Sequence, residues 1–115
     1  MEESQVSEIV KRHFSQQGYK IHPEVPVGGI NREIILDFYC YKDTNPPSIL
    51  WVECKGDVGT SQLLEGFIRL ELAIFYGGGK GVLAIPNYAY HKLMKHRDFL
   101  RQAEEVIRVL NVEKE

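Results

Sequence analysis

The sequence predicts an α/β fold: one domain with a mixed β-sheet flanked by helices. Short apolar runs rich in β-branched and aromatic residues, which are typical of strands, alternate with longer stretches of helical periodicity. The 115 residues can enclose one hydrophobic core but not two. A content of 43% hydrophobic and 26% charged residues is that of an ordinary globular protein. We therefore expect a single domain over residues 1–115 with the order α-β-β-β-α-β-α-β.

The first helix is expected to begin at residue 4 or 7 and to end at residue 17, because its apolar residues recur on one face. Gly18 follows directly, and helices commonly end in a glycine with a left-handed backbone. Residues 19–27 form the first expected strand, and Pro23 and Pro26 indicate that it lies at a sheet edge or bends. Residues 28–31 supply a turn into the next strand, and Arg32 after it is expected to form a surface ion pair.

Two apolar runs, Ile34–Tyr41 and Ile49–Gly56, are expected to form an antiparallel pair joined by a turn that contains two prolines. Side chains alternate along a strand, so Trp51, Glu53 and Lys55 should share one face. Leu50, Val52 and Cys54 should share the other. Asp37, in the middle of the first run, can then lie beside Glu53 and Lys55.

The second half of the chain is expected to contain two more helices and two more strands. The stretch Leu63–Phe75, after capping residues Thr60 and Ser61, is so apolar that it should be covered on more than one side. The glycines of residues 77–81 end this helix and lack the lysine spacing of a phosphate-binding loop.

The run Gly81–Pro86 predicts a central strand, and a helical crossover favours its parallel pairing with the Glu53 strand. Asn87 can cap a third helix that runs to about Gln102. The residues Val106–Leu110 then favour a last strand over a helical continuation, because β-branched residues dominate.

Charged residues at the end of an apolar strand are costly unless they have a partner, a metal or a water-filled site. Glu53 and Lys55 have a simple alternative explanation, a solvent-exposed ion pair at a strand terminus. Asp37 on the neighbouring strand favours a functional site instead. Two carboxylates offer the hard oxygen ligands that Mg²⁺ prefers, and such an ion activates water and neutralises phosphate charge. The pattern indicates phosphodiester hydrolysis.

An acid on one strand followed by Glu-x-Lys on the next resembles the PD-(D/E)XK nuclease superfamily, which includes restriction endonucleases and archaeal Holliday-junction resolvases. The matching residues are Asp37, Glu53 and Lys55, although Leu36 replaces the proline of the motif. The resemblance implies a restriction-endonuclease-like core. It also implies that Asp37, Glu53 and the backbone carbonyl of Cys54 bind Mg²⁺, with Mn²⁺ as a substitute, and that Lys55 acts on the attacking water.

The same resemblance adds two site candidates. Resolvase-like members carry a metal-binding glutamate on the first helix, which corresponds to Glu8, and several branches carry a glutamine that corresponds to Gln62. Each has a structural alternative: Glu8 can be a surface acid near a helix N-terminus, and Gln62 can face solvent. Asp57 is a candidate of the same kind as Gln62.

The resemblance implies a metal-dependent DNA endonuclease, either a Holliday-junction resolvase or a compact restriction-like nuclease, that acts as a homodimer. The formal net charge of -2 argues against a DNA-binding protein, which usually has a basic surface. A late basic cluster offsets this objection, although a solvated helix face also explains it. Its candidate DNA contacts are Lys92, Lys95, Arg97 and Arg101.

A competing interpretation is a module that keeps the nuclease fold without cleaving, and binds nucleic acid or a protein partner. A third is a structural dimer whose charged strand ends form only ion pairs. No signal-peptide pattern or apolar run of transmembrane length is present in the sequence, so we expect a cytoplasmic location. Cys40 and Cys54 are expected to be buried, reduced thiols.

Overall fold

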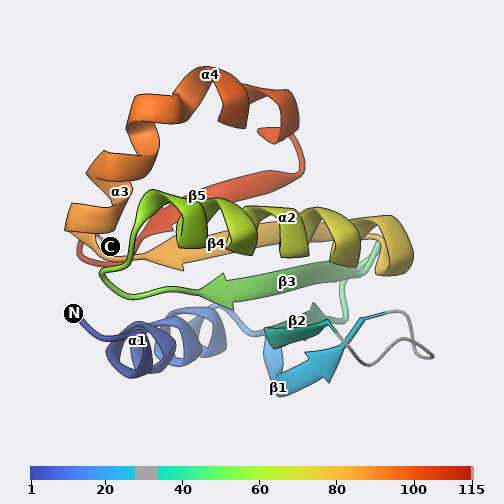
Figure 1. Cartoon of the computed structure of the whole chain (residues 1–115). Helices are drawn as coiled ribbons and strands as arrows, with labels where there is room; N and C mark the ends of the chain where they lie inside the picture. Colours follow the sequence, from blue (N-terminus) through green and yellow to red (C-terminus); the bar gives the residue numbers. More distant parts are fainter. Residues whose placement is uncertain (28–33, 115) are drawn as a thin grey trace.

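The protein, seen here in a computed structural model, is described over residues 1–27 and 34–114 (Figure 1). The expected turn at residues 28–31 and the expected ion pair of Arg32 lie outside the described residues. In chain order the helices and strands are α1 (Glu3–Gln16), β1 (Lys20–Pro26), β2 (Ile35–Lys42), β3 (Ser48–Cys54), α2 (Thr60–Gly77), β4 (Lys80–Ile85), α3 (Asn87–Leu93), η1 (Met94–His96), α4 (Arg97–Leu100), η2 (Arg101–Ala103) and β5 (Ile107–Asn111).

One mixed sheet of five strands, in the order β1-β2-β3-β4-β5, forms the centre of the domain. The first three strands are antiparallel, whereas β3, β4 and β5 run parallel. The predictions of an antiparallel β2–β3 pair, a central β4 parallel to β3, and an edge position for β1 are confirmed. So is the preference for a strand at the C-terminal end.

Helices cover both faces of the sheet, and each face has its own hydrophobic core. The core on one face contains Leu63, Phe67 and Leu70 of α2 together with Leu93 of α3. The core on the other face is centred on α1, which contributes Val6, Val10 and Phe14. Figure 1 shows α2, α3 and α4 on one side of the sheet and α1 on the other. The domain is therefore an α/β sandwich with a helical layer on each face.

Strand alternation agrees with the sequence pattern. Trp51 of β3 packs in the α2 core, while Leu50, Val52 and Cys54 pack in the α1 core. Cys40 and Cys54 are both buried and free, as predicted. Burial raises the pKa of both thiols, so they behave as apolar core groups and not as nucleophiles.

Two details differ from prediction. Helices α2 and α3 have Gly59 and Pro86 at their N-caps, so Thr60, Ser61 and Asn87 are not the capping residues. The single helix expected to reach Gln102 is divided into two short α-helices and two 3₁₀ turns. Its apolar residues are irregularly spaced, and only Ala89, Leu93 and Leu100 are buried, so no continuous apolar face holds it straight.

Helix α2 is expected to be covered on more than one side, as a core helix, a dimer face, or both, and the covering by a second chain stays a prediction. Its inner face is buried, but Ile68, Phe75 and Tyr76 are 52%, 80% and 58% exposed. The single chain thus covers this helix on one side only. Gly78 and Gly79, with φ of 71° and 78°, end the helix as predicted. None of the helices in the described part of the chain is long and apolar enough to cross a membrane.

Candidate active site

The site lies where strands β2 and β3 separate. Their paired residues end at Phe38 and Val52, so Asp37 and Glu53 are the next pair on the α2 side. Beyond this point, backbone N–H groups donate to carboxylate side chains of the opposite strand instead of to its backbone carbonyls. The backbone N–H of Asp37 donates to Glu53 Oε1 at 3.1 Å, and the N–H of Cys54 donates to Asp37 Oδ2 at 2.7 Å. Each carboxylate is held by the backbone of the opposite strand. We call this place the strand fork.

Both carboxylates lie in an environment that disfavours their charge. Glu53 is only 3% exposed, and Asp37 is half-buried. Burial, together with repulsion from Asp37, raises the pKa of Glu53 to about 7. Burial also raises the pKa of Asp37, opposed by the Cys54 N–H and by the positive charges of Lys55 and Arg69. Paired carboxyl groups with shifted pKa values are typical of functional sites.

Lys55 follows directly after β3 and belongs to the fork. Its N–H donates to the carbonyl of Ala84 at 3.1 Å, which continues the pairing with β4. Its aliphatic stem passes over Gly66 of α2, where an added Cβ would stand 3.2 Å from Lys55 Cε. A glycine inside a helix reduces stability by about 1 kcal/mol relative to alanine, and here it makes room for this stem. Within the described residues the Lys55 ammonium group forms no hydrogen bond or ion pair, so it is available to a ligand.

Arg69 is a site residue that the sequence reasoning missed. It projects from α2, where it is the only basic residue. Its Nη2 donates to the carbonyl of Ile35 at 2.7 Å, and its Nε lies 3.5 Å from Glu53 Oε2. A signal was present in the sequence, because Gln62, Gly66 and Arg69 recur at the spacing of one helical face.

Glu24 is a second residue that the sequence reasoning missed. In β1 it stands between Pro23, which pairs with Phe38, and Val25, which pairs with Leu36. This register places it across from Asp37, whose pKa its charge raises. Glu24 is also the non-glycine residue with a left-handed backbone, at a φ of 53°. Nothing in the sequence around the two prolines indicates that conformation.

The structure does not bring Glu8 to the fork. Glu8 is exposed on α1, which covers the other face of the sheet, and its carboxylate pairs with Lys11 at 3.3 Å. Gln62 lies in the first turn of α2 and is exposed, and its side chain has no hydrogen bond within the described residues. Asp57 accepts a hydrogen bond from the amino group of Met1 at 2.6 Å. The close group therefore consists of Asp37, Glu53, Lys55 and Arg69.

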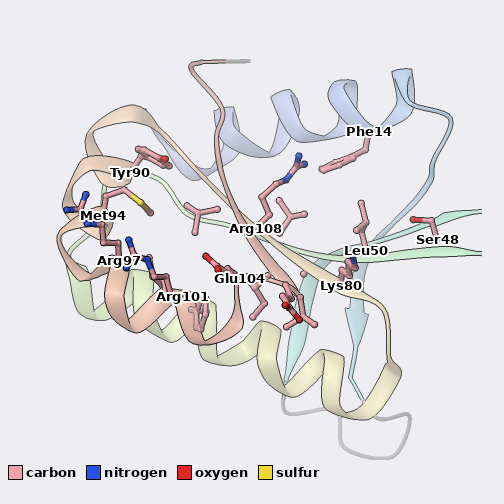
Figure 2. Close-up of a pocket in the computed structure, with 18 of the residues that line it drawn as sticks. Phe14, Ser48, Leu50, Lys80, Tyr90, Met94, Arg97, Arg101, Glu104 and Arg108 are labelled. Atoms are coloured by element: carbon pink, nitrogen blue, oxygen red, sulfur yellow. The ribbon is translucent and has the colours of Figure 1, made fainter.

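The basic candidates lie along the segment from α3 to η2. Lys92 donates to the carbonyl of Val58, in the loop that follows Lys55. A cavity of about 700 Å³ extends between this segment, β5 and the end of α1 (Figure 2). Arg97 and Arg101 line it together with Arg108 of β5, and so do Glu104 and Glu105. Asp37 and Glu53 do not line this cavity. The charges that line this cavity are mixed, and the carboxylate pair lies outside it, so the fork is the stronger candidate site.

The fork offers oxygen donors that suit Mg²⁺. One oxygen of each carboxylate, Oδ1 of Asp37 and Oε2 of Glu53, accepts no hydrogen bond from the backbone of the described residues. The carbonyl of Cys54 points to the same side of β3 as its N–H, toward Asp37. No three His, Cys, Asp or Glu side chains gather into a metal site within the described residues. Mg²⁺ commonly takes only one or two carboxylates and completes its shell with water and phosphate, so the two acids fit this ion.

Comparisons with known proteins found no relative of this chain. The chain matches no protein-family model, no curated protein and no solved structure. Functional inference for this domain therefore rests on the residues of the strand fork.

Proposed function

We propose that this domain is a Mg²⁺-dependent DNA endonuclease with a restriction-endonuclease-like fold of the PD-(D/E)XK type. One observation carries the proposal: Asp37 and Glu53 face each other where β2 and β3 separate, and Lys55 follows directly, with an ammonium group that has no ionic partner among residues 1–27 and 34–114. Structural ion pairs of a strand end would be exposed and mutually neutralising. Here two acids converge at a buried position, which favours a cation-binding role.

Each residue of the fork has a defined task in this proposal. Asp37, Glu53 and the carbonyl of Cys54 would hold Mg²⁺, which supplies an activated water and neutralises phosphate charge when bound. Backbone N–H groups keep both carboxylates in place, so little ordering is needed on binding. Lys55 would orient the attacking water or stabilise the charge that develops on the phosphate. A homodimer would cut both strands of a duplex or branched substrate, and the exposed apolar side of α2 is its candidate interface.

A non-cleaving module with the same fold is the second candidate function, favoured by the net charge of -2 and by the exposed apolar residues of α2. Metal binding separates the two. A ligand that binds only the folded state raises stability by about 2.7 kcal/mol at a hundredfold excess over its Kd. The nuclease proposal therefore predicts a higher melting temperature in Mg²⁺ or Mn²⁺, and the non-cleaving module predicts no change.

Cleavage of labelled four-way junction, linear duplex and single-stranded DNA in Mg²⁺ or Mn²⁺ tests the proposal directly. We expect metal-dependent cutting by the wild type, and its loss in Asp37→Asn and Lys55→Ala. Asp43→Asn is the matched control, because Asp43 is an exposed acid in the turn between the same two strands. Full cutting by Asp37→Asn would overturn the proposal. DNA binding without cutting by the wild type would favour the non-cleaving module.

A further inference from the structure

The two oxygens of the Glu53 carboxylate have different partners. Oε1 accepts the backbone N–H of Asp37, and Oε2 lies 3.5 Å from Arg69 Nε. The side chain of Glu53 is 5% exposed, whereas that of Arg69 is 28% exposed. Arg69 therefore reaches inward from the rim of the site to the one oxygen of this carboxylate that the backbone leaves unused.

The charge balance of the fork explains why the contact between Arg69 and Glu53 matters. Two carboxylates stand together, and a buried charge needs a compensating charge nearby. Lys55 contributes from a distance but forms no ion pair within the described residues. Arg69 is the direct ionic partner of Glu53 there. Its second bond, from Nη2 to the carbonyl of Ile35, anchors the guanidinium group to the first residue of β2.

We propose that Arg69 is a positioning residue that serves as the internal counter-ion of Glu53 and yields Oε2 to the divalent cation when that cation binds. This inference rests on the proposed function, because it takes the fork to be a cation site. The guanidinium group and the metal would compete for the same oxygen. In the metal-free protein Arg69 orients the carboxylate and compensates its negative charge, and the bond to Ile35 keeps the guanidinium group at the rim after exchange.

A counter-ion role differs from a purely structural one in its response to metal. If Arg69 only ties α2 to β2 through Ile35, its removal weakens the fold equally with and without metal. If Arg69 neutralises Glu53, a bound divalent cation replaces that charge and repairs the defect. Removal of a competing positive charge should also strengthen metal binding.

The experiment uses the full chain at pH 8, with Mn²⁺ as the probe, and compares the wild type with Arg69→Gln. Thermal unfolding gives stability, and calorimetric titration gives Mn²⁺ affinity. Without metal we expect the variant to melt lower by roughly 4–8 °C, the shift that about 1 kcal/mol produces in a small domain. In saturating Mn²⁺ we expect the difference to close, with Mn²⁺ bound about tenfold more tightly by the variant. Arg97→Gln, an exposed arginine away from the fork, should change neither quantity.

The outcomes separate this inference from the proposed function. The wild-type titration alone tests the cation site, and absence of Mn²⁺ binding there would remove both. With wild-type binding intact, a melting difference that persists in saturating Mn²⁺, or weaker binding by Arg69→Gln, would overturn the counter-ion role. If Arg69→Gln does not fold, Arg69→Lys keeps the charge but cannot donate to Ile35 and Glu53 together. Arg69→Lys should then also melt at a lower temperature than the wild type without metal. The difference should be smaller than for Arg69→Gln, and Mn²⁺ should remove it.

Discussion

The strand fork and the basic segment from α3 to η2 hold the two groups of predicted functional residues, in opposite surroundings. At the fork, Asp37 and Glu53 are buried or half-buried and bond to each other's strands. Along the basic segment, Lys95 and Arg97 are exposed, and Arg101 pairs with its own neighbour Asp98 at 3.4 Å. The charged groups of the fork form one connected network, whereas the basic groups of the segment are not connected to one another in the described part of the chain.

The difference shows which kind of sequence pattern places residues together. Asp37 and Glu53 are sixteen residues apart, but the pleat and register of paired strands bring them to one point. Lys92 to Arg101 are close in sequence, but they lie along a broken helix, and only Arg97 and Arg101 of the four basic candidates line the cavity. Lys92 itself turns back toward the carbonyl of Val58 at 3.2 Å. Buried charges depend on their partners, whereas exposed charges depend little on theirs.

Of the substitutions that test this comparison, Glu53→Gln should have the largest effect, and the effect is on the free energy of unfolding. The pKa of Glu53 is raised from 4.5 to about 7, so between these pH values the folded state binds more protons than the unfolded state. The contribution of Glu53 to the free energy of unfolding therefore falls as pH rises from about 4.5 to about 7, and stays low above that. Glu53→Gln keeps an acceptor for the N–H of Asp37 but carries no charge. We expect it to stabilise the metal-free protein at pH 8 by up to about 3 kcal/mol, as measured by urea unfolding.

The same measurement at pH 4.5 serves as the internal control, because wild-type Glu53 is then protonated and the advantage of Glu53→Gln should vanish. Arg97→Gln is the matched control from the basic segment, with an expected change within about 0.5 kcal/mol at either pH. A Glu53→Gln protein that is less stable than the wild type at pH 8 would contradict this account of the fork. A Glu53→Gln protein that is more stable than the wild type but does not cleave DNA would show the usual trade-off between stability and activity at an active site.

A smaller effect is expected at Glu24, at the edge of the fork. A left-handed backbone is unfavourable by about 1 kcal/mol for a residue with a Cβ, and glycine escapes this penalty. Glu24→Gly should therefore stabilise the protein by up to about 1 kcal/mol in urea unfolding, less the added freedom of the unfolded chain. Glu24→Gln separates strain from charge, because it keeps the Cβ but removes the repulsion with Asp37. Equal stabilisation by both variants would assign the effect to charge alone.

Much of the fold and the centre of the site could be predicted from the sequence, because both depend on short-range periodicity. The alternation of side chains along β3 predicted that Trp51 and Glu53 lie on the same face of the sheet. The order of helices and strands was predicted from apolar runs and turn residues. Arg69 was missed because the helical face that it shares with Gln62 and Gly66 does not by itself indicate a site. Only the packing of α2 brings the guanidinium group of Arg69 to Glu53 of β3. Glu24 was missed because a left-handed backbone at a glutamate is set by tertiary context. Glu8 was selected by sequence position, and the helix that carries it packs on the opposite face.

The smallest expected effect belongs to the basic segment, and it concerns binding. Lys95 and Arg97 are exposed and form no ion pair within the described residues, so Lys95→Ala and Arg97→Ala should leave stability and Mn²⁺ affinity unchanged. If the segment contacts DNA phosphates, each substitution should reduce by about one the slope of log binding constant against log salt concentration. Fluorescence anisotropy with labelled duplex at several salt concentrations measures this slope. An unchanged slope would mean that the segment is only a solvated surface, and would leave the strand fork as the remaining candidate site.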